Sequence, residues 1–183
     1  MPLRMTSGLR ITPTTVPSPP LCAFQAQVRP KWCWAACVAM VVDSLHRPQR
    51  PTQCEIAGAH IGRACCGLPR VSCVGAGGNA CDKTCHPDDI DALWAENHVP
   101  AQRQEFPLTL AQLDDQILNV KRPVMVYLEG GNATFDHVML VVGKHDATWF
   151  VVADPCLNNF TVATHEELLR GRAGWHRTWI NLR

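Results

Sequence analysis

The pattern of hydrophobic and polar positions divides the chain into a helical first half and a strand-rich second half. Residues 32–46 carry apolar side chains on nearly every side of a helix, which predicts a buried helix. A second helix is predicted over 52–62, because Thr52 and Glu55 have the spacing of a capping box. A third helix is predicted over 87–97, with a proline in its first turn and acidic residues near the positive end of its dipole.

The second half contains short apolar runs separated by turn residues, which is typical of antiparallel strands. Thr109 opens a short amphipathic helix that leads into this half. Strands are predicted over 123–128, 137–142, 149–153, 159–163 and 175–182, with a short helix over 164–170. Helices first and strands last predict an α+β fold, and we expect one domain over 21–183.

The composition of the N-terminal segment and of the whole chain limits the classes of protein to which the chain could belong. Residues 1–20 are rich in Pro, Thr and Ser and lack a continuous apolar core, so we interpret them as a flexible lead-in and not as a Sec signal peptide. No stretch reaches the roughly 18–20 apolar residues that span a bilayer. The 183 residues are 46% hydrophobic and 18% charged, with a net charge of +1. This balance gives no electrostatic reason to bind nucleic acid or an anionic membrane surface.

Ten cysteines favour an oxidising final environment, which is at odds with the missing Sec signal. Export by a dedicated machine would reconcile the two observations. The segment 63–86 is a loop without periodicity, and it needs cross-links or a metal to hold a shape. Disulfides are the first interpretation for Cys54, Cys65, Cys66, Cys73, Cys81 and Cys85. A zinc site with His86 as a ligand is the alternative, although the paired C-x2-C spacing of zinc knuckles is absent.

Four side chains could together perform nucleophilic chemistry. Cys33 begins the predicted buried helix, where unpaired backbone N–H groups and the helix dipole stabilise a thiolate. His137 opens an apolar strand and Asp154 ends the next one. If these strands are adjacent and antiparallel, the carboxylate can orient the imidazole toward the thiolate. Gln27, six residues before Cys33, could donate to an oxyanion together with the Cys33 N–H.

These residues resemble the papain-like cysteine peptidases, in which a Gln stands six residues before a catalytic Cys that is followed by Trp-Ala. Gln27, Cys33, Trp34 and Ala35 match that pattern, and the chain order of Gln, Cys, His and Asp is also the family's. The chain is most similar to the compact bacterial effector branch and to the double-glycine leader peptidases of bacteriocin exporters. Plant and lysosomal members usually have Asn where this chain has Asp154.

The resemblance implies a cysteine peptidase with catalytic Cys33, His137, Asp154 and Gln27, and with no cofactor or metal. Trp32 and Trp34 are candidates for a substrate-facing wall, although Trp32 could equally be core. The resemblance also implies a protein or peptide substrate and a secreted effector or toxin, delivered into a target cell by a specialised secretion system. Such a toxin would need a cognate immunity protein in the producing cell.

Other interpretations of the same residues stay open. Cys33 could be a buried structural thiol, and Cys37 is a rival nucleophile one helical turn later that is otherwise core or a disulfide partner. Transglutaminases, deamidases and arylamine acetyltransferases share the order of Cys, His and Asp. A non-catalytic binding module, stabilised by disulfides or zinc, is the alternative from another class of protein.

Overall fold

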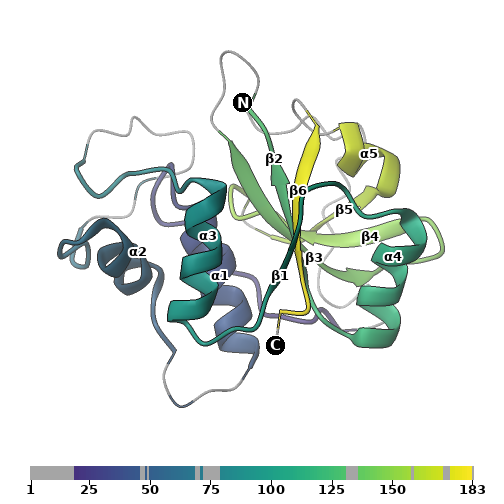
Figure 1. Cartoon of the computed structure of the whole chain (residues 1–183), viewed down its shortest axis with the longest axis horizontal. Helices are drawn as coiled ribbons and strands as arrows, with labels where there is room; N and C mark the ends of the chain where they lie inside the picture. Colours follow the sequence, from purple (N-terminus) through teal and green to yellow (C-terminus); the bar gives the residue numbers. More distant parts are fainter. Residues whose placement is uncertain are drawn as a thin grey trace.

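A computed structural model gives the structure of residues 19–45, 48, 50–68, 71, 79–130, 136–157, 159–170 and 174–182. The lead-in predicted over 1–20 lies outside the described residues, apart from residues 19 and 20. Helices α1, α2 and α3 lie together on one side of a sheet, and α4 and α5 lie on the other side (Figure 1). The predicted α+β fold is therefore confirmed.

The three predicted helices of the first half are present. They are α1 (Cys33–Ser44), α2 (Gln53–Ile61) and α3 (Pro87–Glu96). The capping box expected from Thr52 and Glu55 is formed: the Thr52 hydroxyl accepts from the Glu55 N–H, and the Glu55 carboxylate accepts from the Thr52 N–H. Ten of the twelve residues of α1 are buried, as expected for a helix that is apolar all round.

Within the described residues, six strands form one antiparallel sheet with the order β1-β6-β2-β3-β4-β5. The helices after α3 flank this sheet. The elements are β1 (Gln102–Gln104), α4 (Leu110–Asp114), the π-helical turn η2 (Asp115–Val120), β2 (Val124–Leu128), β3 (His137–Lys144), β4 (Trp149–Ala153), β5 (Thr161–Thr164), α5 (His165–Arg170) and β6 (Trp175–Ile180).

Two hydrophobic cores cover the two faces of the sheet. One core packs α1, α2 and α3 against alternate residues such as Met125, Val138 and Leu140. The other packs α4, η2 and α5 against the intervening residues, such as Val124 and Met139. Because both faces are covered, β2 is buried at every position, and the strands read as continuous apolar runs without alternation.

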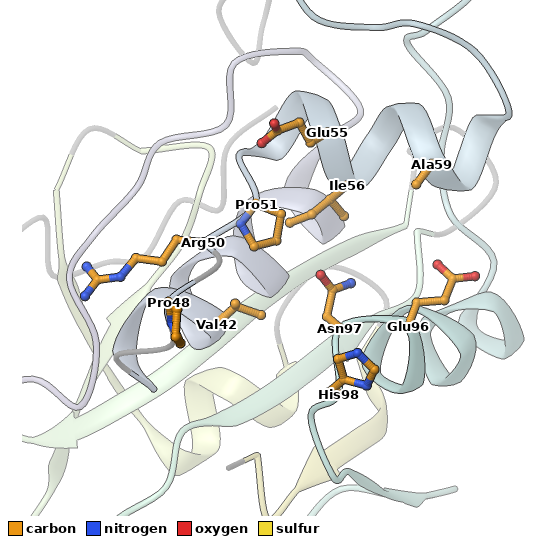
Figure 2. Close-up of a pocket in the computed structure, with 10 residues that line it drawn as sticks. All are labelled: Val42, Pro48, Arg50, Pro51, Glu55, Ile56, Ala59, Glu96, Asn97 and His98. Atoms are coloured by element: carbon orange, nitrogen blue, oxygen red, sulfur yellow. The ribbon is translucent and has the colours of Figure 1, made fainter.

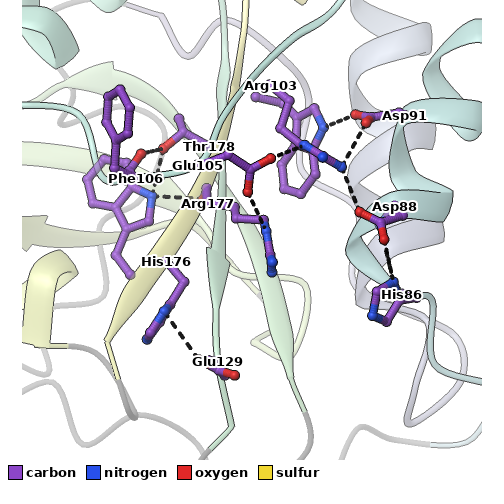
Figure 3. Close-up of polar contacts among 12 residues, drawn as sticks. His86, Asp88, Asp91, Arg103, Glu105, Phe106, Glu129, His176, Arg177 and Thr178 are labelled. Carbon is purple, nitrogen blue, oxygen red and sulfur yellow. Dashed lines mark hydrogen bonds and ion pairs between the residues drawn. The ribbon is translucent and has the colours of Figure 1, made fainter.

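Charged side chains join α3 to the edge of the sheet (Figure 3). Arg103 on β1 contacts Asp88 at 2.8 Å and Asp91 at 2.9 Å, and both acids belong to α3. Arg103 also contacts Glu105 at 2.6 Å, and Glu105 accepts from Arg177 on β6 at 2.9 Å. These contacts fix the helical layer to the sheet, so elements from both can contribute to one site.

Disulfides hold the segment between α2 and α3. Cys54 pairs with Cys66, and Cys65 pairs with Cys81. Cys156 is also disulfide-bonded. His86 is the N-cap of α3, where its Nδ1 accepts from the Asp88 N–H. The disulfide interpretation of Cys54, Cys65, Cys66 and Cys81 is therefore correct, while Cys73 lies outside the described residues.

Among the described residues, no helix has the length and apolar character that a bilayer crossing needs.

Candidate active site

Cys33 is the first residue of α1 and points its backbone N–H out of the helix start. The first four N–H groups of a helix have no partner within it, and the N-cap, Trp32, makes no side-chain capping bond. The first turn carries no acidic residue. Cys33 itself is a free cysteine with 8% of its surface exposed. The start of α1 therefore places the Cys33 thiol beside backbone N–H groups that no capping side chain binds.

His137 and Asp154 meet at the same end of neighbouring antiparallel strands. His137 is the first residue of β3, and Asp154 follows the last residue of β4. The His137 Nε2 lies 2.7 Å from the Asp154 Oδ1, and both side chains are buried. The Cys33 side chain interacts with the same imidazole and helps to raise its pKa. Since Nε2 is held by the carboxylate, Nδ1 is the nitrogen that remains for the thiol.

The surroundings of His137 favour its protonated form. Burial lowers the imidazole pKa, but the charge and hydrogen bond of Asp154, with the hydrogen bond and charge of Cys33, outweigh burial and raise the pKa to about 10. A carboxylate on one side and a thiol on the other are the surroundings that stabilise an imidazolium. The arrangement can therefore hold a thiolate–imidazolium pair.

Asp154 is itself held in place by the turn that follows it. Its Oδ1 also accepts from the Cys156 N–H at 2.9 Å, and the Leu157 N–H donates to the Asp154 carbonyl at 3.0 Å. The disulfide at Cys156 restrains the same turn. The Pro155 carbonyl accepts from the Gln27 N–H at 2.9 Å. The segment before α1 is therefore tied directly to the turn that carries the carboxylate.

The Gln27 side chain is buried and turned toward its own loop. Its Nε2 donates to the Arg29 carbonyl at 2.7 Å and to the Pro30 carbonyl at 2.8 Å. These two bonds use both hydrogens of the amide, while Gln27 Oε1 is buried with no hydrogen-bond partner among the described residues. Donation by Gln27 to an oxyanion stays a prediction, because it requires one of these bonds to be exchanged.

The two tryptophans beside Cys33 are buried in the core, and a contact between either of them and a substrate stays a prediction. Trp32 is 1% exposed and Trp34 is 2% exposed. The Trp32 indole N–H donates to the Cys81 carbonyl at 2.7 Å, and the Trp34 indole N–H donates to the Lys83 carbonyl at 3.1 Å. Both residues therefore anchor the start of α1 to the disulfide-bonded loop.

Two polar residues that the sequence did not single out hold the same loop. The Gln53 side chain accepts from the Val28 N–H at 3.1 Å and donates to the Ala26 carbonyl at 3.0 Å. Buried Asp82 accepts from the Lys31 N–H at 2.9 Å. Neither residue could be identified from the sequence, because α2 and the loop before α3 approach the segment 26–31 only in the folded chain.

A large cavity lies away from these groups. It has a volume of about 860 Å³ and is formed where the end of α1 meets α2 and the end of α3 (Figure 2). One of its lining residues, Val42, is nine residues after Cys33, which is roughly 14 Å along a helix. The cavity is therefore separate from the cluster of Cys33, His137 and Asp154.

Comparison with known proteins gives a family for the chain and a solved structure with a similar fold. A model of the family described as "Papain-like cysteine protease AvrRpt2" matches residues 19–167. The fold is similar to the crystal structure of the peptidase domain of Streptococcus ComA, a bi-functional ABC transporter involved in a quorum-sensing pathway, with a TM-score of 0.55. The identity is 12%, and the match covers 86% of this chain and 95% of that domain. No curated protein matches the chain.

Proposed function

The chain belongs to the papain-like cysteine protease family of AvrRpt2, and from this premise we propose that it cleaves a protein substrate with Cys33 as nucleophile, His137 as base and Asp154 as orienting carboxylate. Membership makes the chain a cysteine peptidase. One observation supports the choice of residues most strongly: a single imidazole bonds to the Asp154 carboxylate at 2.7 Å and interacts with the Cys33 side chain. A base that contacts both a nucleophile and an orienting group is the arrangement that nucleophilic catalysis requires.

In the proposed reaction, His137 Nδ1 takes the proton from the Cys33 thiol. The thiolate attacks the carbonyl carbon of the scissile peptide bond and forms a tetrahedral intermediate. The C–N bond then breaks, and the imidazolium returns its proton to the leaving amine. Water, deprotonated by the same imidazole, hydrolyses the thioester and restores the thiol. Asp154 holds the ring orientation through Nε2 during both half-reactions.

The oxyanion of the tetrahedral intermediate needs donors beside Cys33. The Cys33 N–H at the uncapped start of α1 is one. We propose Gln27 Nε2 as the second, released from the Pro30 or Arg29 carbonyl when substrate binds. The backbone bond from Gln27 to Pro155 supports this assignment, because it keeps the side chain beside the turn that carries Asp154.

Gln27→Ala is expected to lower kcat by roughly 10²–10³-fold, which is the effect of removing one oxyanion donor. KM should change little, because the lost bond forms only in the transition state. Steady-state kinetics on a peptide substrate would measure both. Gln53→Ala is the matched control: it also removes a glutamine that holds the segment 26–28, but this side chain bonds only to Val28 and Ala26. Equal losses in the two variants would assign Gln27 a structural role.

The proposed setting is outside the producing cell. Two defined disulfides and a fifth disulfide-bonded cysteine, Cys156, support an oxidising environment. We propose a secreted effector or toxin, delivered by a specialised secretion system, with an immunity protein that blocks the cluster of Cys33, His137 and Asp154 in the producer. The free state of Cys33 argues against a binding module in which this residue is oxidised.

The experiment compares a cell lysate incubated with the wild-type protein and the same lysate incubated with Cys33→Ala, with new protein N-termini labelled and identified by mass spectrometry. New termini that need Cys33 are the expected result, and their sequences would name the cleaved bond. Ammonia release from substrate glutamines without new termini would instead assign the chain to the deamidases or transglutaminases.

A further inference from the structure

Three side chains of types that commonly bind metal ions lie close together where the end of α2 faces the start of α3. His60 is in the last turn of α2, Cys85 lies just before α3, and Asp89 is in the first turn of α3. One ligand atom from each of them lies within 4.8 Å of the others. None of the three belongs to the proposed catalytic machinery. They combine nitrogen, sulfur and oxygen ligands at one point.

The ligand atoms of this cluster have few other bonding partners. Among the described residues, the His60 ring nitrogens and the Asp89 carboxylate make no hydrogen bond or ion pair, and the Cys85 thiol makes only a 3.5 Å bond to the His86 carbonyl. The neighbouring acids of α3, Asp88 and Asp91, both pair with Arg103 instead. Of the three aspartates of α3, Asp89 is therefore the one that pairs with no cationic side chain among the described residues.

The cluster is also held rigidly by its surroundings. The disulfide between Cys65 and Cys81 joins the two segments that carry His60 and Cys85, with a Cα–Cα distance of 5.7 Å. Trp34 packs edge-on against the His60 ring at a centroid distance of 5.1 Å and an angle of 66°. Because Trp34 follows Cys33 directly in α1, the His60 ring is fixed to the helix that carries the thiol.

We propose that His60, Cys85 and Asp89 form a metal site for a divalent transition metal, with zinc as the favoured ion. Imidazole with thiolate selects zinc or a related transition metal over calcium and magnesium, which prefer oxygen ligands alone. Three protein ligands leave the fourth tetrahedral position for water. The ion would join the end of α2 to the start of α3, next to Trp34 of α1.

The test uses cobalt as a spectroscopic substitute for zinc, in the Cys33→Ala protein, so that the proposed catalytic pair cannot contribute a thiolate ligand. We expect one equivalent of cobalt to give a thiolate charge-transfer band and tetrahedral d–d bands, which zinc then displaces. Free zinc at a hundredfold above its Kd should raise Tm by about 5–10 °C. Cys85→Ser should remove the charge-transfer band, and His60→Gln and Asp89→Asn should each weaken binding by at least about tenfold.

His176→Gln is the control, because this exposed histidine is on β6 and pairs with Glu129, away from α3 (Figure 3). It should bind cobalt like the parent protein. Circular dichroism checks that each variant is folded, and exposed Asp89 is the position least expected to disturb the fold. A charge-transfer band that persists in Cys85→Ser would overturn the proposal. Unchanged affinity in either His60→Gln or Asp89→Asn would do the same.

Discussion

Cys33→Ala is expected to lower kcat by about 10⁶-fold, the scale on which an enzyme loses rate when its nucleophile is removed. It should also abolish covalent labelling by a thiol-directed epoxide inhibitor of papain. The physical reason is position: among the free cysteines, Cys33 alone lies at the start of α1 and interacts with His137. Mass spectrometry of the labelled protein, alongside steady-state kinetics, would measure both effects.

Two other free cysteines, Cys37 and Cys22, provide the controls, since both are buried. Burial, with the nearby charges of Cys33 and Asp154, raises the pKa of the Cys37 thiol well above its ordinary value. Burial and Asp43 raise the pKa of Cys22 to about 12. These thiols stay protonated at neutral pH and are poor nucleophiles. Cys37→Ala should therefore keep its label and its activity, and a label that survives in Cys33→Ala would refute the assignment of the nucleophile.

The helix and strand positions could be predicted because local signals agreed with the final packing. The capping box at Thr52, the proline at the start of α3 and the apolar runs of β2, β3 and β4 each define an element without help from distant residues. β1 was not predicted, because its three residues, Gln-Arg-Gln, are polar and form a strand only by pairing with β6. The π-helical turn η2 was predicted as ordinary helix, because six residues are too few to distinguish the period of a π-helix from that of an α-helix.

The meeting of His137 with Asp154 followed from strand order, because antiparallel neighbours joined by a short turn bring the start of one strand to the end of the next. Side-chain direction could not be predicted in this way. Gln27 has the right spacing, yet its amide points at the Arg29 and Pro30 carbonyls. Trp32 lies in the core because a carbonyl from the distant loop, that of Cys81, accepts its indole N–H.

The disulfide connectivity could not be predicted from the sequence either. Adjacent Cys65 and Cys66 bond in different directions, to Cys81 and to Cys54, and spacing alone does not distinguish this connectivity from its alternatives. From the sequence, Cys85 was grouped with the other loop cysteines as a disulfide partner or, together with His86, as a zinc ligand. In the folded chain Cys85 is free and lies beside His60 and Asp89, which come from two different helices.

Asp154→Ala is expected to lower kcat by about 10⁴-fold, because removal of the third member of a triad costs less than removal of the nucleophile or base. One oxygen, Asp154 Oδ1, accepts from both His137 and Cys156. An asparagine Oδ1 can accept the same two bonds, so Asp154→Asn keeps the orientation of the ring and removes only the charge. We therefore expect Asp154→Asn to lose less activity than Asp154→Ala. Equal losses would mean that the charge, and not the orientation, is the whole contribution.

The pH dependence separates charge from orientation more directly. The His137 pKa is raised from 6.5 to about 10 by interactions that outweigh its burial, with the Asp154 charge first among them. The alkaline limb of kcat/KM should therefore lie near pH 10 in the wild type and move to lower pH in Asp154→Asn, although the ring keeps its hydrogen bond. An unmoved limb in Asp154→Asn would show that the carboxylate charge does not set the titration of His137.

The same shift predicts how stability varies with pH. The folded protein holds the His137 proton more tightly than the unfolded chain does, so this group contributes its full stabilisation below about pH 6.5. That contribution is lost as the pH rises from about 6.5 through 10. The free energy of unfolding of the wild type should fall over this window in excess of the fall measured for Asp154→Asn, as read from urea titrations at successive pH values. Parallel curves for the two proteins would contradict the raised pKa, because the charge of Asp154 is what sustains the imidazolium in the folded state.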